Sequence, residues 1–329
     1  MGLFAGHRDA ARRRGALLPL LVLLLGCGGA AHAADTVRVG KAIAVAFTFI
    51  QPDIGKAAGV WQKYGLDPEV IAFAGDAKMQ QAFAAGSIDF AMGSGPSMAF
   101  AVKGSPVRAV AAYMGSPVHM GLVVGYNAPI KSAADLKGKK LAVTTVGSLT
   151  DWLGQQLSIA QGWGPGGITT VALGTQQAIY AALRTGQVDG VITNTDIHRE
   201  FEERKEGRDI LNAGSFVPHF ITEVIFARTD LIEKQPELVQ RFVNGFFASV
   251  AFMKHNRART IDIAAKAMGI DKEVTASAYD IDMPAMIDDG RFDPSALAAV
   301  KSSFLEMKLL DSEPPDDALL TKRFLPARP

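Results

Sequence analysis

Residues 82–92 read AFAAGSIDFAM, and residues 182–192, 100 positions later, read ALRTGQVDGVI. Each copy predicts the end of a helix, a glycine that caps it, a turn with an aspartate and a short buried strand. Two units with one plan favour two lobes of the same design. Chance similarity is the alternative, because helix–glycine–strand units are common.

Strand-like and helix-like stretches alternate on both sides of the two copies. The sequence predicts strands over residues 36–43, 68–73, 88–92, 107–113, 140–145, 169–173 and 188–193. It predicts helices over residues 54–64, 78–85, 97–102, 149–161 and 176–184, and a mainly helical last third over 229–304. Strands that alternate with helices of this length indicate parallel α/β units.

Composition excludes several classes of protein. The chain has 329 residues, 48% of them hydrophobic and 20% charged, so it can bury the core of one or two domains and is not disordered. The net charge is +1; the first 33 residues contribute four arginines against one aspartate, +3, which leaves −2 for the rest. Because such a body lacks a positive field, we expect no nucleic-acid partner.

The only cysteine is Cys27, which excludes a disulfide framework, a cysteine zinc site and Cys–His catalysis in the body of the chain.

The N-terminus has the features of an export signal. Three arginines at 12–14 precede an apolar run over 16–25, which is too short to span a bilayer. Small residues at Ala31 and Ala33 predict a signal peptide over 1–33, with cleavage after Ala33. The alternative is lipidation of Cys27, because residues 24–27, LLGC, resemble a bacterial lipobox. Either outcome places the mature chain outside the cytoplasm, in the periplasm.

Five short segments, taken in order, carry a family resemblance. They are residues 63–70 (KYGLDPEV), 82–89 (AFAAGSID), 134–143 (ADLKGKKLAV), 186–190 (GQVDG) and 236–239 (PELV) with Phe242. With the export signal, they resemble the periplasmic substrate-binding proteins of ABC importers of the nitrate, sulfonate, taurine and thiamine-precursor group. The resemblance covers nearly all of the mature chain.

This resemblance implies the fold: an α/β, two-lobed periplasmic binding protein of type II. Each lobe would be a mixed sheet flanked by helices, and two hinge strands would join the lobes. Lobe 1 would comprise residues 34–120 and 221–329, and lobe 2 residues 121–220. The chain would cross between them near Met120 and Phe220.

The resemblance also implies the function of an extracytoplasmic solute-binding component. A monomer would capture a small molecule in the cleft between the lobes and deliver it to an ABC permease in the inner membrane. A periplasmic sensor domain is an alternative with the same binding chemistry. We expect no enzyme, cofactor or metal site, because the chain has no phosphate-binding loop, no nucleophile elbow and no His-Glu-x-x-His motif. The aspartates at 280, 282, 288, 289 and 293 lack calcium-loop spacing and predict a solvated acidic face.

Candidate ligand-binding residues follow from the rule that ligands bind beyond the carboxyl ends of parallel strands. Three loops lie there and lead into helices, whose N-terminal N–H groups suit an oxyanion. They contain Ser94, Gly95, Ser97, Thr145, Gly147, Ser148, Asn194 and Asp196. Ordinary helix capping is the alternative role for the hydroxyls.

Aromatic residues and one histidine complete the candidate site. Phe47 and Thr48 follow the first strand, Trp152 lies in the first turn of the helix over 149–161, and His219 lies near the predicted return crossing. The aromatic residues could stack on a flat ligand, and core packing is the alternative. We therefore expect a small organic anion, of the sulfonate or aromatic acid type. The alternative is a neutral pyrimidine, because Asp196 would repel an anion and these loops carry no lysine or arginine.

Overall fold

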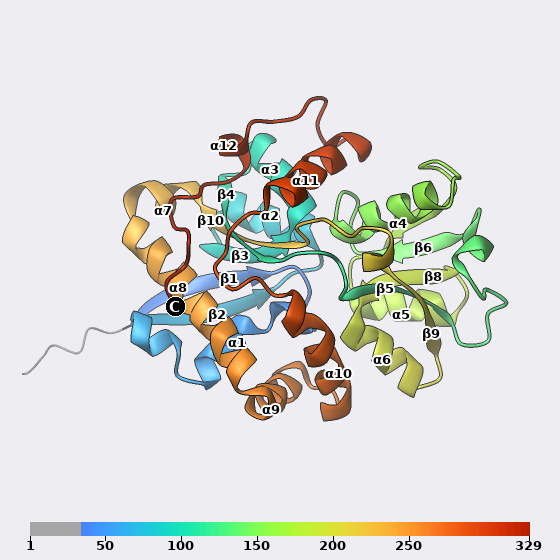
Figure 1. Ribbon diagram of the computed structural model, residues 1–329, viewed down its shortest axis with the longest axis horizontal. Coiled ribbons are helices and arrows are strands. Elements are labelled where there is room, and N and C mark those ends of the chain that lie inside the picture. Colours follow the sequence, from blue (N-terminus) through green and yellow to red (C-terminus); the bar gives the residue numbers. More distant parts are fainter. Residues whose placement is uncertain (1–33) are drawn as a thin grey trace, which may run out of the picture. The chain divides into compact units, whose positions relative to one another are not determined.

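The structure is a computed structural model, and it describes residues 34–329. The predicted signal peptide and the lipidation of Cys27 therefore lie outside the described residues. Figure 1 shows two sheets: one has blue and cyan strands with a single gold strand from later in the chain, and the other has green to yellow strands.

The first sheet has the strand order β2-β1-β3-β10-β4. Its strands are β1 (Asp35–Lys41), β2 (Leu66–Ala72), β3 (Phe90–Ser94), β4 (Val107–Met114) and β10 (Glu223–Arg228). β1 pairs in parallel with β2 and β3, whereas β10 runs antiparallel to β3 and β4.

The second sheet has the order β7-β6-β8-β5-β9. Its strands are β5 (Met120–Gly125), β6 (Lys140–Val143), β7 (Thr169–Ala172), β8 (Gly190–Asn194) and β9 (Gly207–Asn212). β6 pairs in parallel with β7 and β8, and β5 runs antiparallel to β8 and β9. The expected mixed sheet in each half is confirmed, and the two sheets share one arrangement.

The repeated sequence pattern occupies the same place in both sheets. Helix α2 (Asp76–Ala84) leads into β3, and helix α5 (Gln176–Arg184) leads into β8, each through a left-handed glycine, Gly86 or Gly186. Asp89 then accepts the backbone N–H of Arg38 in β1, and Asp189 accepts that of Lys140 in β6. Each aspartate thus ties its turn to the neighbouring parallel strand.

The remaining helices cover the sheets and form most of the last third of the chain. They are α1 (Gln51–Ala57), α3 (Ala99–Val102), α4 (Leu149–Ala160), α6 (Thr195–Glu203), α7 (Thr229–Lys234), α8 (Pro236–His255), α9 (Arg257–Met268), α10 (Lys272–Asp282), α11 (Pro294–Glu306) and α12 (Asp316–Leu319). Short 3-10 turns are η1 (Phe47–Phe49), η2 (Trp61–Tyr64), η3 (Gly95–Met98), η4 (Ala133–Leu136), η5 (Ala213–Ser215) and η6 (Met283–Ala285). The single helix expected over 54–64 is divided into α1 and η2, because Gly59 adopts a positive φ of 74° between them.

Within residues 34–329, no helix has both the length and the apolar composition that a bilayer span requires.

The chain crosses between the sheets twice. It passes from β4 to β5 through residues 115–119, and from β9 to β10 through residues 213–222. β5, β9 and β10, which adjoin these crossings, are strands that the sequence analysis did not assign.

Aromatic packing fixes the long helix α8 on the first sheet. Phe242 stacks on Phe90 of β3, with ring centroids 3.9 Å apart, and on Trp61, 5.3 Å away. All three rings are fully buried, and each contributes about 1.5–3 kcal/mol by leaving water. Figure 1 shows α8 in orange across this sheet.

One predicted surface residue is buried. The solvated acidic face was expected to include Asp282, but Asp282 is 2% exposed, whereas Asp280 and Asp288 are exposed and paired with Arg257 and Lys254. Asp282 ends α10 on the side that packs against α6, so this prediction was wrong for that residue.

Candidate functional site

A cavity of about 300 Å³ lies between the two sheets. Its walls are residues 42–45 after β1, 72–74 at the end of β2, Thr144 after β6, 174–177 between β7 and α5, and 192–194 at the end of β8. These segments are the carboxyl ends of the parallel strands of both sheets. The cavity therefore lies where open α/β sheets bind ligands.

The cavity wall is apolar with a limited set of neutral polar groups. Side chains of Ile43, Val45, Phe73, Ile179 and Ile192 supply the apolar part. The polar part comprises the hydroxyls and amides of Thr144, Thr150, Thr175, Gln176, Gln177, Thr193 and Asn194, with the phenol of Tyr180. Within the described part of the chain, no Lys, Arg, His, Asp or Glu lines this cavity. Such a wall suits an organic ligand with an apolar body.

The N-terminus of α5 faces the cavity. Thr175 caps this helix, because its Oγ1 accepts the N–H of Ala178 at 3.3 Å. Tyr180 lies on the second turn of α5, accepts a hydrogen bond from Gln176 at 2.6 Å and donates one to Glu200 at 3.0 Å. Burial raises the pKa of Tyr180, so the phenol stays neutral beside the ligand space.

Three hydroxyls form a cluster where β6 leads into α4. Thr144 Oγ1 lies 3.0 Å from Ser148 Oγ and 3.1 Å from Thr150 Oγ1, and the last two lie 3.0 Å apart. Ser148 is also the N-cap of α4 and donates to the carbonyl of Thr145 at 2.7 Å. Because these hydroxyls bond mainly to one another, one of them can turn away from its neighbour and form a hydrogen bond with a ligand instead.

A smaller chamber of about 30 Å³ adjoins the cavity and shares Ala42, Ile43, Thr144, Thr150 and Asn194 with it. Two carboxylic side chains, Asp76 of α2 and Glu223 of β10, line this chamber. Asp76 accepts the N–H of Ser94 at 3.1 Å and its hydroxyl at 2.7 Å. Burial raises the pKa of both acids, and the nearby Asp76 raises that of Glu223 further.

Three of the residues predicted from sequence line these two spaces. They are Ser94, Ser148 and Asn194. Asn194 also donates to the hydroxyl of Thr48 at 3.4 Å, from the second sheet to η1. The structure therefore brings together one residue from each of the three loops that the sequence analysis selected.

The other residues of the first loop lie in the packing behind the chamber. Gly95 is pressed against the carbonyl oxygen of Ile221, which leaves no room for a side chain. Ser97 is fully buried and donates to the carbonyl of Ser94 at 2.7 Å. Both support the loop and lie outside the lining of the two spaces.

The other residues of the second loop join the two sheets. The methyl group of Thr145 faces Gly75 of the first half so closely that a Cβ there would clash, and Gly75 has a φ of 93°. Gly147 donates its N–H to Asp151 at 2.9 Å and has a φ of 77°. Neither Thr145 nor Gly147 lines the cavity or the chamber.

Asp196 and Phe47 meet between the halves. The Asp196 carboxylate accepts the backbone N–H of Phe47 at 3.1 Å, while its other oxygen has no partner within residues 34–329. Burial raises the pKa of Asp196 to about 6, although backbone N–H groups, that of Phe47 among them, and the nearby His198 oppose this shift. The ring of Phe47 packs edge-on against Tyr279 of α10, with centroids 6.0 Å apart.

Trp152 and His219 lie outside the cavity lining. The Trp152 ring stacks on Phe220 at 4.1 Å, and its Nε1 donates to Glu306 of α11 at 2.7 Å. Trp152 is 4% exposed, so it joins α4 to the return crossing and to α11. His219 is exposed.

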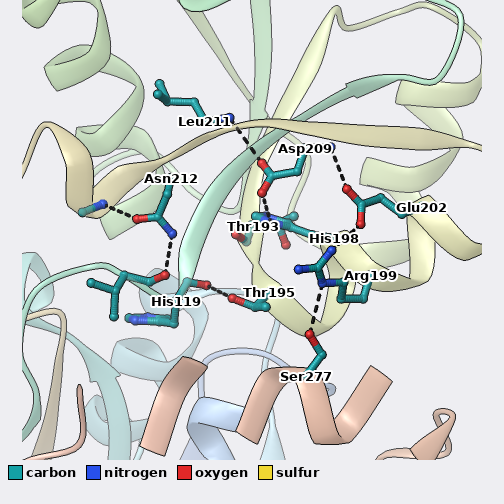
Figure 2. A network of polar contacts seen from close by, with 12 residues as sticks. His119, Thr193, Thr195, His198, Arg199, Glu202, Asp209, Leu211, Asn212 and Ser277 are labelled. Carbon is teal, nitrogen blue, oxygen red and sulfur yellow. Dashed lines mark hydrogen bonds and ion pairs between the residues drawn. The ribbon is translucent and has the colours of Figure 1, made fainter. Parts of the chain in front are cut away.

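The polar contacts behind β8 fix the start of α6 (Figure 2). Thr195 donates to the carbonyl of His119 in the first crossing at 3.0 Å, and His198 lies 2.7 Å from the carbonyl of Thr193. Arg199 donates to Ser277 of α10 at 3.1 Å, which connects α6 to the last third of the chain. Burial lowers the pKa of His119 to about 3, so this imidazole is neutral.

Sequence reasoning missed several residues of the cavity and the chamber. Thr175 follows the edge strand β7, Asp76 follows the edge strand β2, and both open helices. The strand-end rule applied to these two edges would have found them. Glu223 begins an antiparallel strand, so the rule carries no signal for it.

Comparisons with known proteins give the same architecture. The structure matches that of the alkanesulfonate-binding protein SsuA from Xanthomonas axonopodis bound to MOPS, with a TM-score of 0.72 and 17% identity over 85% of this chain and 95% of that one. It also matches the periplasmic aliphatic sulphonate binding protein SsuA from Escherichia coli, with a TM-score of 0.70 and 22% identity over 87% and 92% of the two chains. The predicted periplasmic binding protein fold is confirmed.

The sequence comparison identifies the family. The model of the NMT1/THI5-like family matches residues 53–259, more than half of the chain, so the chain belongs to this family. A Bacillus subtilis protein provisionally named an aliphatic sulfonates-binding protein is 25% identical over 264 residues, which cover 78% of this chain and 79% of that protein.

The fold also occurs in an enzyme. The desulfurization enzyme DSZB has a TM-score of 0.62 and 15% identity over 88% of this chain and 97% of that one. The fold alone therefore does not distinguish a binding protein from an enzyme, so the function must be argued from the residues of the cavity.

Proposed function

We propose that this protein is the extracytoplasmic solute-binding component of an ABC importer and that its solute binds in the 300 Å³ cavity. The observation that carries this proposal is the position of the cavity, at the carboxyl ends of the parallel strands of both sheets. A ligand there would touch both halves at once and favour their closure. Family membership supports the same function.

The proposal includes the lobes and hinges expected from sequence. Lobe 1 comprises residues 34–120 and 221–329, lobe 2 comprises 121–220, and the crossings over 115–119 and 213–222 act as hinges. The protein works as a periplasmic monomer, and an inner-membrane permease recognises the closed form. Export by the leader and an optional lipid anchor at Cys27 belong to this proposal.

For the solute, the cavity wall supports a small organic molecule with an apolar body. An anionic group of the expected sulfonate or carboxylate type would meet the N-terminus of α5 beside Thr175. A neutral heteroaromatic solute, the alternative expectation, is supported by the many amide and hydroxyl groups. Ser94, Ser148, Asn194 and Thr175 are proposed as direct contacts. Phe47, Thr48, Gly95, Ser97, Thr145, Gly147, Trp152 and Asp196 are proposed to act through the surrounding packing. His219, which is exposed, is proposed to act at the return crossing.

Catalysis is not part of the proposal. A cysteine nucleophile is absent from residues 34–329, and none of the Asp, Glu, His, Lys or Arg side chains in this range lines the main cavity. Incubation of the protein with any solute that binds, followed by mass spectrometry of the solute, tests this point. A converted product would contradict the binding function.

The test of the site is the variant Ala74→Trp. Ala74 and Gly174 line the cavity side by side, one from each half, and a Cβ added at Gly174 would lie 3.9 Å from the Ala74 Cβ. An indole here would occupy the ligand space and add no charge to it. A thermal-shift screen of sulfonates, aromatic acids, amines and pyrimidines should give solutes that stabilise the wild type by about 2.7 kcal/mol at 100 times their Kd and fail to stabilise this variant.

The matched control is Ala258→Trp, on the exposed surface of α9. It should keep the full shift with every solute. If Ala74→Trp is folded by circular dichroism and still binds as the wild type does, the solute does not occupy this cavity and the proposed site is wrong.

A further inference from the structure

The inner chamber has room for one small head group. Its volume of about 30 Å³ exceeds the 10–15 Å³ or so that a single water molecule needs. It adjoins the main cavity, and five residues line both spaces. A solute in the cavity could therefore extend a group of ammonium size into the chamber.

One acid of the chamber has an oxygen that no donor of the described chain reaches. Asp76 and Glu223 are each 4% exposed. Both oxygens of Asp76 accept from Ser94, but Oε2 of Glu223 has no hydrogen-bond partner within residues 34–329. A buried oxygen without a donor costs free energy that a ligand N–H group would recover.

No cation of the described chain balances these two acids. The titratable groups near Glu223 are Asp76 from α2, Tyr113 from β4 and His119 from the first crossing. Burial keeps the phenol of Tyr113 neutral by raising its pKa, and keeps His119 neutral by lowering its pKa to about 3. His119 Nε2 is 4.0 Å from Glu223 Oε1, beyond hydrogen-bond distance. The acids therefore face an environment without positive charge.

We infer that this chamber is a subsite for a protonated amino or amidino group of the solute, and that Glu223 releases its proton when this group binds. The inference rests on the proposed function, since it places the rest of the solute in the main cavity. In the empty chamber Glu223 is a neutral carboxylic acid, because a second negative charge beside Asp76 is unfavourable. A cation between the two acids removes that penalty, so the proton leaves Glu223 for solvent and the carboxylate accepts the ligand N–H.

The subsite also sets the orientation of the solute. An anionic group would be repelled by Asp76, so it would remain in the main cavity near the N-terminus of α5. The cationic group and any anionic group would thus lie at opposite ends of the bound molecule.

Calorimetric titration with three probes of one shape tests the inference. Benzylamine, benzyl alcohol and phenylmethanesulfonate share an aromatic body and differ in the charge of the head group. At pH 7, in two buffers of different ionisation enthalpy, benzylamine should bind about tenfold or more tighter than the other two. Its binding should release close to one proton.

The variant Glu223→Gln tests whether the proton released on benzylamine binding comes from Glu223. It should remove the buffer dependence and weaken benzylamine about tenfold or more, while Asp76→Asn weakens benzylamine through the other acid. Glu69→Gln, on the exposed face of β2, makes the same chemical change away from the chamber and should match the wild type.

Three results would overturn the inference: preferred binding of phenylmethanesulfonate, benzylamine binding without proton release, or failure of all three probes to bind. A preferred anion that Ala74→Trp abolishes would leave the proposed function standing and remove only the cationic subsite. Probe binding that Ala74→Trp does not affect would instead contradict the proposed site.

Discussion

Asp196 is a buried carboxylate, and its negative charge destabilises the folded state. It accepts one backbone N–H across the two halves, and its second oxygen has no partner among the described residues. Its pKa is raised to about 6 by burial, against 3.8 for a free aspartate. The folded state therefore favours the neutral form. Its stabilising contribution is present below pH 4 and is lost as the pH rises through 6.

We predict that Asp196→Asn stabilises the protein at pH 7.5 by about 1–3 kcal/mol. The amide oxygen can still accept the N–H of Phe47, and the buried charge is gone. Urea unfolding at pH 7.5 and pH 4 measures the effect, which should largely vanish at the lower pH. The control Asp311→Asn, on the exposed surface, should be neutral at both. A loss of stability at pH 7.5 would show that the carboxylate is needed as a charge.

At the residue scale, each of the three loops selected from sequence contributes one residue to the cavity or the chamber. These residues are Ser94, Ser148 and Asn194. Trp152 was chosen as a stacking residue, but its partners are Phe220 and Glu306, and the latter is 154 positions away. Contacts between residues so far apart in the sequence cannot be predicted from a local sequence pattern.

The elements that sequence predicted best are those with local signals. Helix α5 begins and ends where expected, and the glycines at 86 and 186 have the positive φ that a helix-ending glycine supplies. Strands β5, β9 and β10 were not predicted from the sequence, because their antiparallel pairing with distant strands defines them. The turn aspartates of the two repeats have the same backbone role but different surroundings.

We predict that Asp89→Asn costs about 2–3 kcal/mol, whereas Asp189→Asn costs about 1 kcal/mol or less. Asp89 accepts three hydrogen bonds from Arg38, at 2.7–3.0 Å, and its side chain is 14% exposed. Burial raises the pKa of Asp89, but the Arg38 guanidinium outweighs this effect and holds the pKa below its usual value. Asp189 keeps one backbone N–H and a Lys139 contact at 3.4 Å, with its side chain 32% exposed.

Urea unfolding of both variants at pH 7 gives the comparison, and each variant is the control for the other. Equal losses would mean that the shared backbone hydrogen bond carries the whole effect. A larger loss for Asp189→Asn would contradict the account.

At the scale of the whole molecule, acids buried between the halves outnumber buried cations. Burial raises the pKa of Asp76, Asp196, Glu223 and Asp282. His119 is the opposing group, with its pKa lowered to about 3. The four acids stabilise the folded state at low pH and lose this effect as the pH rises through their folded pKa values. His119 opposes them only below its unfolded pKa of 6.5.

We therefore predict that the free energy of unfolding is highest near pH 4 and falls by about 2 kcal/mol or more by pH 8. Urea titrations at intervals of half a pH unit measure this profile. Glu223→Gln should flatten its alkaline side, and Glu69→Gln should leave it unchanged. Stability that rises steadily toward pH 8 would mean that these acids are ionised in the folded protein.

The overall plan was predictable because it repeats. Two copies of one local pattern, 100 residues apart, predicted two sheets of one design, and the cavity lies at the strand ends that the strand-end rule selects. The paired acids of the chamber were not predictable, because Asp76 and Glu223 are separated by 146 intervening residues and meet only when β10 returns to pair with β3 in the first sheet.

The central claim is that the solute occupies the cavity between the two sheets. The most direct test is a crystal structure of the protein with the solute that gives the largest thermal shift. The account predicts ligand density against residues 42–45, 72–74 and 174–177, with a polar group reaching toward Asn194. Density for a stoichiometric solute at any other place, with this cavity filled by ordered water alone, would contradict it.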